Sequence, residues 1–189
     1  MIYLTFKFLH IVGFILLGSG LVGVFVAEWR SRQTRDIRLI AEAHRYMTIF
    51  YDGVVLPGAI LVGLSGLLLM FYLQFGFFQI PWLTGMWLLF AFEFMEGNTI
   101  TRIHFRKMRR VSQAALNEGR VTSELQEKMD DKVGTFTHYL DLPLFFVIVS
   151  LGGLRPATWT HFTLGTLLAL VTGLALSSFL PRMYRKQEG

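Results

Sequence analysis

The feature that most constrains this chain is the length of its apolar segments. A helix needs roughly 20 mainly apolar residues to cross a bilayer, and five stretches meet this requirement: 4–27, 46–73, 82–101, 133–154 and 157–180. Charged residues make up only 16% of the 189 residues, whereas they make up about 25% of a typical soluble domain. The sequence therefore predicts an all-α, polytopic membrane helix bundle with five transmembrane helices.

The distribution of basic residues predicts the orientation of the bundle. Of the 18 Lys and Arg residues, 16 fall in segments 30–45 and 102–132 and in the C-terminal tail, and only Lys7 and Arg155 fall on the other side. Short loops rich in Lys and Arg stay in the cytoplasm. We therefore expect the N-terminus outside and the C-terminus inside, in a multi-pass protein of the bacterial cytoplasmic (inner) membrane. Because this topology accounts for the net charge of +5, nucleic-acid binding is not expected.

The expected spans divide the chain into two parts. Residues 1–156 are predicted to form a four-helix membrane core, and residues 157–189 a fifth transmembrane helix with a basic cytoplasmic tail. Segment 102–132 is expected to extend the third helix into the cytoplasm, to turn near 117–119 and to return through 123–129. We expect it to act as a solvated connector.

Small residues recur every four positions along the expected fifth helix, at Gly165, Ala169 and Gly173. Small side chains at this spacing allow helices in lipid to approach closely. The stripe therefore predicts a packing seam within the bundle.

Three candidate haem ligands lie near the expected outer face: His10, Met86 and His161. Imidazole and thioether groups are axial ligands of haem iron, and helix bundles hold cofactors between facing helices. We expect at least one haem b here, with His10 as one ligand and either His161 or Met86 as the second. His10 lies in the otherwise apolar segment 8–12, where an unpaired imidazole would be costly. The alternatives are an interfacial His161 beside Trp159 and a Met86 that only packs.

A second group of ionisable residues is expected toward the inner face: Glu28, Asp52, Glu93, Glu96, His138 and Asp141. Residues three apart share a helix face, which pairs Glu93 with Glu96 and His138 with Asp141. This spacing suits metal ligands in helix bundles. It also suits a proton relay, or an ion-pair network with Arg45 and Arg102, and these alternatives stay open.

Two further histidines, His44 and His104, lie beside arginines at expected helix ends. We expect both at the membrane interface. A second haem or another metal on the inner side, held by His44 and His138, is a further alternative.

Several classes of chemistry are excluded by what the sequence lacks. There is no cysteine, which excludes disulfides, thiolate metal sites and a cysteine nucleophile. The sequence also contains no nucleophile elbow, phosphate-binding loop, dinucleotide fingerprint or zinc-protease motif. Any enzymatic activity is therefore expected to be membrane redox chemistry.

The opening of the chain, Lys7-Phe8-Leu9-His10-Ile11, resembles the Lys-x-Leu-His-Ile opening of HemJ-type membrane protoporphyrinogen oxidases. That group also includes CopD-like proteins and uncharacterised bacterial membrane proteins. Arg45, Pro57 and Gly66-Leu67 are similar to its second span. Leu140-Asp141-Leu142-Pro143, followed by Arg155-Pro156, looks like its acidic-x-Pro segment and closing basic-Pro. The resemblance covers roughly residues 1–156.

This resemblance implies that His10 ligates haem b, as the first-helix histidine is thought to do in that group. Met86 stands where the group has an intramembrane lysine, and Glu28 and Glu96 stand near its later histidines. The chain is therefore expected to be a divergent relative, closer to an uncharacterised bacterial branch than to the oxidase, with a different second ligand.

Together these features predict a haem b-binding membrane redox protein. It would pass electrons to or from a quinone, a porphyrinogen or a protein partner, while the inner carboxylates move the coupled protons. One alternative is a protein that handles or senses copper or iron through His10, Met86 and the inner acids, because Met and His ligands suit copper. The other is a cofactor-free accessory subunit, and homo-oligomerisation is left open.

Overall fold

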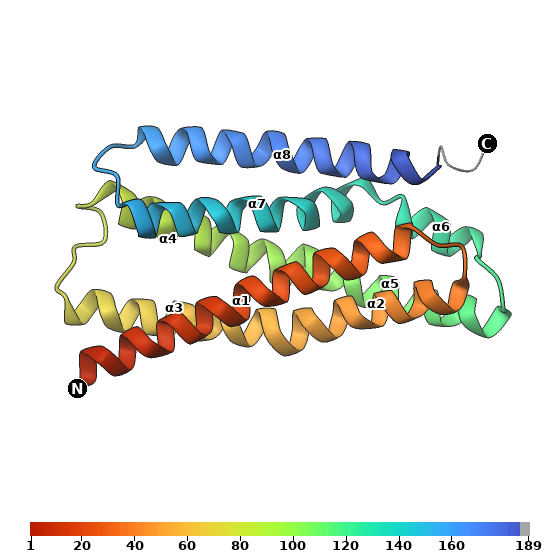
Figure 1. Ribbon diagram of the computed structural model, residues 1–189, viewed down its shortest axis with the longest axis horizontal. Helices are drawn as coiled ribbons and strands as arrows, with labels where there is room; N and C mark the ends of the chain where they lie inside the picture. The colour runs from red at the N-terminus through yellow and green to blue at the C-terminus, as the bar shows by residue number, and fades with distance from the viewer. Residues whose placement is uncertain (186–189) are drawn as a thin grey trace.

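The computed structural model describes residues 1–185, with side chains through residue 180, and shows an extended bundle of long helices with the N-terminus at one end (Figure 1). Its elements are α1 (Ile2–Arg32), α2 (Ile37–Phe50), η1 (Tyr51–Val55), α3 (Leu56–Tyr72), α4 (Pro81–Glu96), η2 (Gly97–Thr101), α5 (Arg102–Glu118), α6 (Ser123–Met129), α7 (Lys132–Leu154) and α8 (Thr160–Arg185). The two η segments are π-helical. The prediction of an all-α fold is confirmed for the described residues.

Four helical runs are long and apolar enough to cross a membrane: Ile2–Arg32, Ile37–Tyr72, Lys132–Leu154 and Thr160–Leu180. The fifth expected span, 82–101, is not among them. It forms the 16-residue helix α4 and then η2, and Glu93 and Glu96 lower its apolar character. Nevertheless α4 packs against α7 and continues through η2 into α5 along the bundle (Figure 1).

Large apolar side chains cover the outside of these runs. Ile15, Leu64 and Leu168 are 58%, 58% and 68% exposed. A soluble monomer rarely exposes large contiguous apolar surfaces, so this surface suits the hydrocarbon of a bilayer.

The segment η1 widens the second long run just before Pro57. Proline lacks a backbone N–H and its ring displaces the carbonyl of the preceding turn, which favours a local π-bulge. The sequence analysis predicted one continuous helix here and did not anticipate η1 or η2.

Glycines let α1 and α3 approach closely. A Cβ atom on Gly58 would lie 2.6 Å from the backbone nitrogen of Leu17, and one on Gly13 would lie 2.8 Å from that of Val62. Such contacts between small residues are how helices pack tightly in lipid. These contacts place the N-terminal half of α1 directly against α3.

The predicted small-residue seam is an internal contact between α8 and α7. A Cβ atom on Gly165 would meet Val147, and one on Gly173 would meet Leu140. Ala169 between them is 3% exposed. The seam therefore holds α8 onto the bundle.

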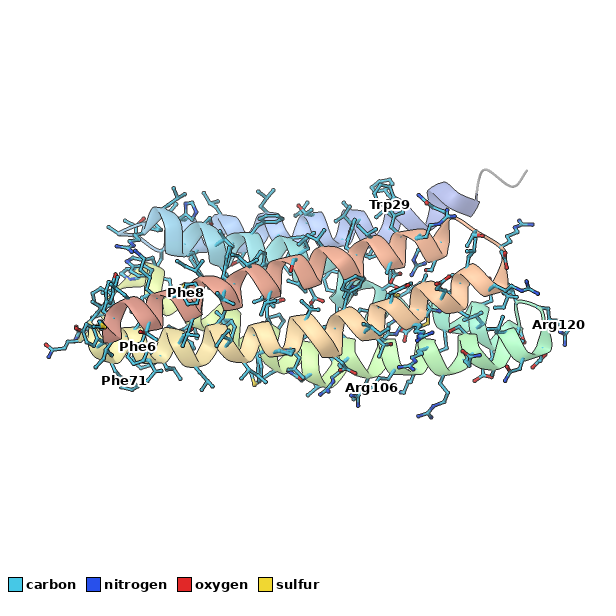
Figure 2. All side chains as sticks on the ribbon, turned by 60° about the horizontal axis from the view of Figure 1, so that its bottom comes forward. Phe6, Phe8, Trp29, Phe71, Arg106 and Arg120 are labelled. Atoms are coloured by element: carbon cyan, nitrogen blue, oxygen red, sulfur yellow. The ribbon has the colours of Figure 1, made fainter. Side chains whose placement is uncertain are left out.

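The connector after η2 has the predicted hairpin form. Gly119 ends α5 with a left-handed φ of 72°, Thr122 caps α6, and Asp131 caps α7. Apolar residues of α2, α5 and α6 form a small core of their own at this end. Figure 2 shows Arg106 and Arg120 in this half of the bundle, and the aromatic residues Phe6, Phe8 and Phe71 near the opposite end.

Candidate functional site

A cavity of about 480 Å³ lies in the half of the bundle near the N-terminus, between α1, α3, α4 and α7. Aromatic and aliphatic side chains form most of its wall. A largely apolar cavity of this size with a few polar groups is typical of a cofactor or ligand site. The polar groups in its wall therefore decide what it can bind.

His10 is the imidazole in the wall of this cavity, which we call the outer cavity because it lies in the half of the bundle that contains the N-terminus. Its Nδ1 atom lies 3.2 Å from the carbonyl oxygen of Val62 and 3.2 Å from Oγ of Ser65. A carbonyl oxygen can only accept a hydrogen bond, so the Val62 contact requires Nδ1 to carry the proton. Within the described part of the chain Nε2 has no hydrogen bond, and in this tautomer it keeps its lone pair.

Met86 of α4 lines the same cavity, so the structure brings together two of the three candidate outer ligands. Lys7 of α1 and Arg155, which follows α7, are the two cations in the wall. The Arg155 guanidinium carbon lies 5.5 Å from the ring centroid of Trp82, which suits a cation–π contact. The cavity thus combines an apolar interior with two positive charges.

His161 is the third candidate, and it does not belong to the wall of this cavity. Its Nε2 atom lies 3.1 Å from Oγ of Ser150 on α7. Of the two alternatives for the second outer ligand, His161 is thus the one that lies outside the wall of the cavity lined by His10. The physical reason is that α8 packs on α7, whereas the cavity is enclosed by α1, α3, α4 and α7.

A buried cluster of ionisable residues lies in the half of the bundle away from the N-terminus, which we call the inner end. The guanidinium of Arg32 donates to Glu28 at 2.6 Å, and both side chains are less than 10% exposed. His138 lies between two carboxylates, with Nε2 3.8 Å from Glu28 and Nδ1 3.9 Å from Asp141. These distances are too long for hydrogen bonds.

Glu93 and Glu96 continue the cluster along α4. The hydroxyl of Thr101 donates to Glu96 at 2.8 Å and lies 3.2 Å from the hydroxyl of Thr137. Glu93 and Asp141 line a second cavity of about 50 Å³. The structure therefore places His138 between Glu28 of α1 and Asp141 of α7, and it places Glu93 of α4 beside Asp141 in the wall of the second cavity.

Asp52 does not join this cluster. It pairs with Arg102 at 2.6 Å and with Arg106 at 3.0 Å, and its side chain is 29% exposed. Arg45, the other partner considered from sequence, is exposed. Asp52 thus has the structural role of an ion pair.

His44 and His104 are buried within the bundle, and their expected level at the membrane interface stays a prediction. They are 1% and 7% exposed, because α2 and α5 pack against each other beyond the apolar part of the bundle. Burial lowers the pKa of His104, although nearby Glu28 and Asp131 oppose this effect. Among the described residues, no group of three or more His, Asp or Glu side chains is arranged to hold a metal.

Sequence reasoning missed Arg32 as part of the site. Arg32 bonds to Glu28 and also donates to the hydroxyl of Thr135 at 3.2 Å. Its position four residues after Glu28 is a signal for a helical ion pair. No comparable local signal links Thr101 to Thr137, because their contact depends on η2 packing against α7.

A family model described as "Predicted integral membrane protein (DUF2269)" matches residues 4–156. The chain belongs to this family. No curated protein and no solved structure matches it. Membership in the DUF2269 family shows an integral membrane protein and does not connect the chain to HemJ or CopD, so that resemblance stays a prediction. The family match ends before α8.

Proposed function

We propose that the protein is a five-span membrane redox protein that binds haem b in the outer cavity. The observation that carries this proposal is the 3.2 Å contact between Nδ1 of His10 and the carbonyl oxygen of Val62, which favours the tautomer with the proton on Nδ1. A histidine that ligates a metal commonly donates its other ring N–H to a carbonyl group. His10 has this arrangement and lines a cavity of about 480 Å³.

The other polar groups of the cavity also fit haem b. A porphyrin has an apolar macrocycle and two propionates, and the wall offers aromatic surfaces together with the cations Lys7 and Arg155. Met86 supports the proposal as the second axial ligand, since thioether sulfur binds haem iron. His161 is not used, because it bonds to Ser150 outside the cavity.

Each residue has a distinct task in this proposal. The bond from Nδ1 of His10 to the Val62 carbonyl fixes the ring and raises the basicity of Nε2. Lys7 and Arg155 hold anionic groups, and the aromatic wall excludes water. Haem iron, when bound, supplies one-electron transfer, and the electron partner would be a quinone, a porphyrinogen or a protein.

In the proposed topology the N-terminus lies outside the cytoplasm, so the outer cavity lies toward the outer side of the membrane. Residues 82–101 would form the third span, since α4 runs beside α7. The Arg-rich connector formed by α5 and α6 would then lie in the cytoplasm of a bacterial cell, as the distribution of Lys and Arg favours.

Titration of haem-free protein with haemin in detergent tests this function. We expect a Soret band that saturates at about one haem per chain, because each chain has a single His10 and this residue lines the outer cavity. Gly66 lines the cavity and Gly53 has open space around its Cβ position. Gly66→Phe should therefore prevent saturation, whereas the matched control Gly53→Phe should not.

Other outcomes of the same titration would support different functions. A colourless protein that carries stoichiometric copper by elemental analysis would support metal handling by His10 and Met86. A protein that binds neither haem nor copper would support a cofactor-free accessory role.

A further inference from the structure

His138 occupies a special place on α7, because each of its ring nitrogens faces a different carboxylate. Nε2 lies 3.8 Å from Glu28 on the inner side, and Nδ1 lies 3.9 Å from Asp141 on the outer side. A neutral imidazole can accept a proton at one nitrogen and release a proton from the other. The geometry therefore places a proton carrier between two proton-binding groups.

This histidine is also buried without hydrogen bonds. His138 is 3% exposed, and neither ring nitrogen has a hydrogen-bond partner in the described part of the chain. The same holds for one oxygen of Asp141. Leaving buried polar atoms unpaired costs folding free energy, so their retention calls for a functional reason.

A small cavity lies between this line of groups and the outer cavity. It measures about 50 Å³ and is lined by Glu93 and Asp141, which is enough for at least one water molecule. The walls of both cavities share Leu17, Phe90, Phe145 and Ile148. These side chains therefore separate the carboxylates from the outer cavity, and the rings of Phe90 and Phe145 are the largest of them.

Near the inner end, a second buried histidine lies beside a partly exposed carboxylate. Nδ1 of His104 lies 3.5 Å from Asp131, whose side chain is 35% exposed. Arg32 holds the other oxygen of Glu28, which leaves one oxygen facing His138.

We propose that Glu28, His138, Asp141 and Glu93 form a proton pathway that leads from the inner end of the bundle toward the outer cavity. A proton enters His138 at Nε2 from the side of Glu28, and another leaves Nδ1 toward Asp141 and Glu93. Phe90 and Phe145 prevent the pathway from leaking protons across the membrane. The pathway deepens the proposed function, since it supplies protons to chemistry in the outer cavity, but it does not require haem to conduct.

Proton flux into liposomes that contain the haem-free full-length protein tests the pathway. Vesicles hold a trapped pH-sensitive dye, and a potassium diffusion potential drives the protons. Replacing Phe145 by Ala should join the two cavities and increase the flux at least tenfold over wild type. Phe146→Ala is the matched control, because Phe146 is 59% exposed toward lipid, and its flux should equal that of wild type.

Second substitutions identify the route. His138→Gln or Asp141→Asn, added to Phe145→Ala, should return the flux to the wild-type level. Phe90→Ala serves as a second way to open the pathway if Phe145→Ala does not fold. A flux that persists in both double variants, or folded Phe145→Ala and Phe90→Ala proteins with no increase, would overturn the proposal. Because no haem is used, failure of haem binding would not affect this result.

Discussion

The carbonyl oxygen of Val62 on α3 lies 3.2 Å from Nδ1 of His10 on α1. The two helices can hold this contact because Gly13 and Gly58 let their backbones approach closely. The bond decides which ring nitrogen carries the proton and leaves Nε2 available at the outer cavity. One packing contact thus fixes the orientation of the His10 ring.

Exchange of Met86 tests the second axial ligand. We expect Met86→Leu to keep haem but to lower its midpoint potential, because methionine ligation raises the potential of a haem. Leucine keeps the approximate volume of the side chain and removes the sulfur. A redox titration followed in the visible spectrum measures this change, and an unaltered potential would remove Met86 from the ligand set.

The close contact between α1 and α3 should be sensitive to one added methyl group. Gly58→Ala would place Cβ 2.6 Å from the backbone nitrogen of Leu17, so the helices must move apart at a cost of about 1–3 kcal/mol. Gly53→Ala is the control, since nothing lies within 4 Å of its Cβ position. Unfolding in detergent should distinguish the two variants, and equal stabilities would contradict the observed packing.

The pair formed by Arg32 and Glu28 should matter far more than the pair formed by Arg106 and Asp52. Arg32→Met leaves a buried carboxylate without its partner, which costs about 3–5 kcal/mol. Arg106 is 54% exposed, so Arg106→Met should cost less than about 1 kcal/mol. The comparison uses the unfolding free energy in detergent, and similar losses in both variants would refute the buried pair.

Acid should destabilise the protein through His104. Burial lowers the pKa of His104 in the folded state below its ordinary value of 6.5, so the unfolded chain binds the proton more readily. The contribution of His104 to stability is therefore complete above pH 6.5 and is lost as the pH falls below this value. The fall in Tm from pH 7.5 to pH 5.5 should be smaller in His104→Asn than in wild type; an equal fall would exclude His104 as the cause.

Helix content and the connector could be predicted from sequence because their signals are local. Long apolar stretches indicate spans, and Gly119 is a recognisable helix end. The predicted third span, residues 82–101, was harder to recognise as a membrane helix, because Glu93 and Glu96 interrupt its apolar character. The two π-segments escaped prediction because only Pro57 gives a local reason for either of them.

The candidate site could be predicted only in part. His10 and Met86 were found by residue type and depth, and they line one cavity. The same reasoning chose His161, because the depth of a residue in the membrane does not show whether its helix packs beside the cavity. The burial of His44 and His104 could not be predicted for a related reason, since it depends on the packing of α2 on α5.

The visible spectrum of the protein as purified from cells tests the central claim most directly, when His10→Ala is compared with His161→Ala. Both variants remove one imidazole, but only His10 lines the outer cavity. We expect His10→Ala to lose the Soret band and His161→Ala to keep it. A Soret band of wild-type intensity and position in His10→Ala, or no haem in the wild-type protein, would contradict the assignment of the outer cavity as a haem site.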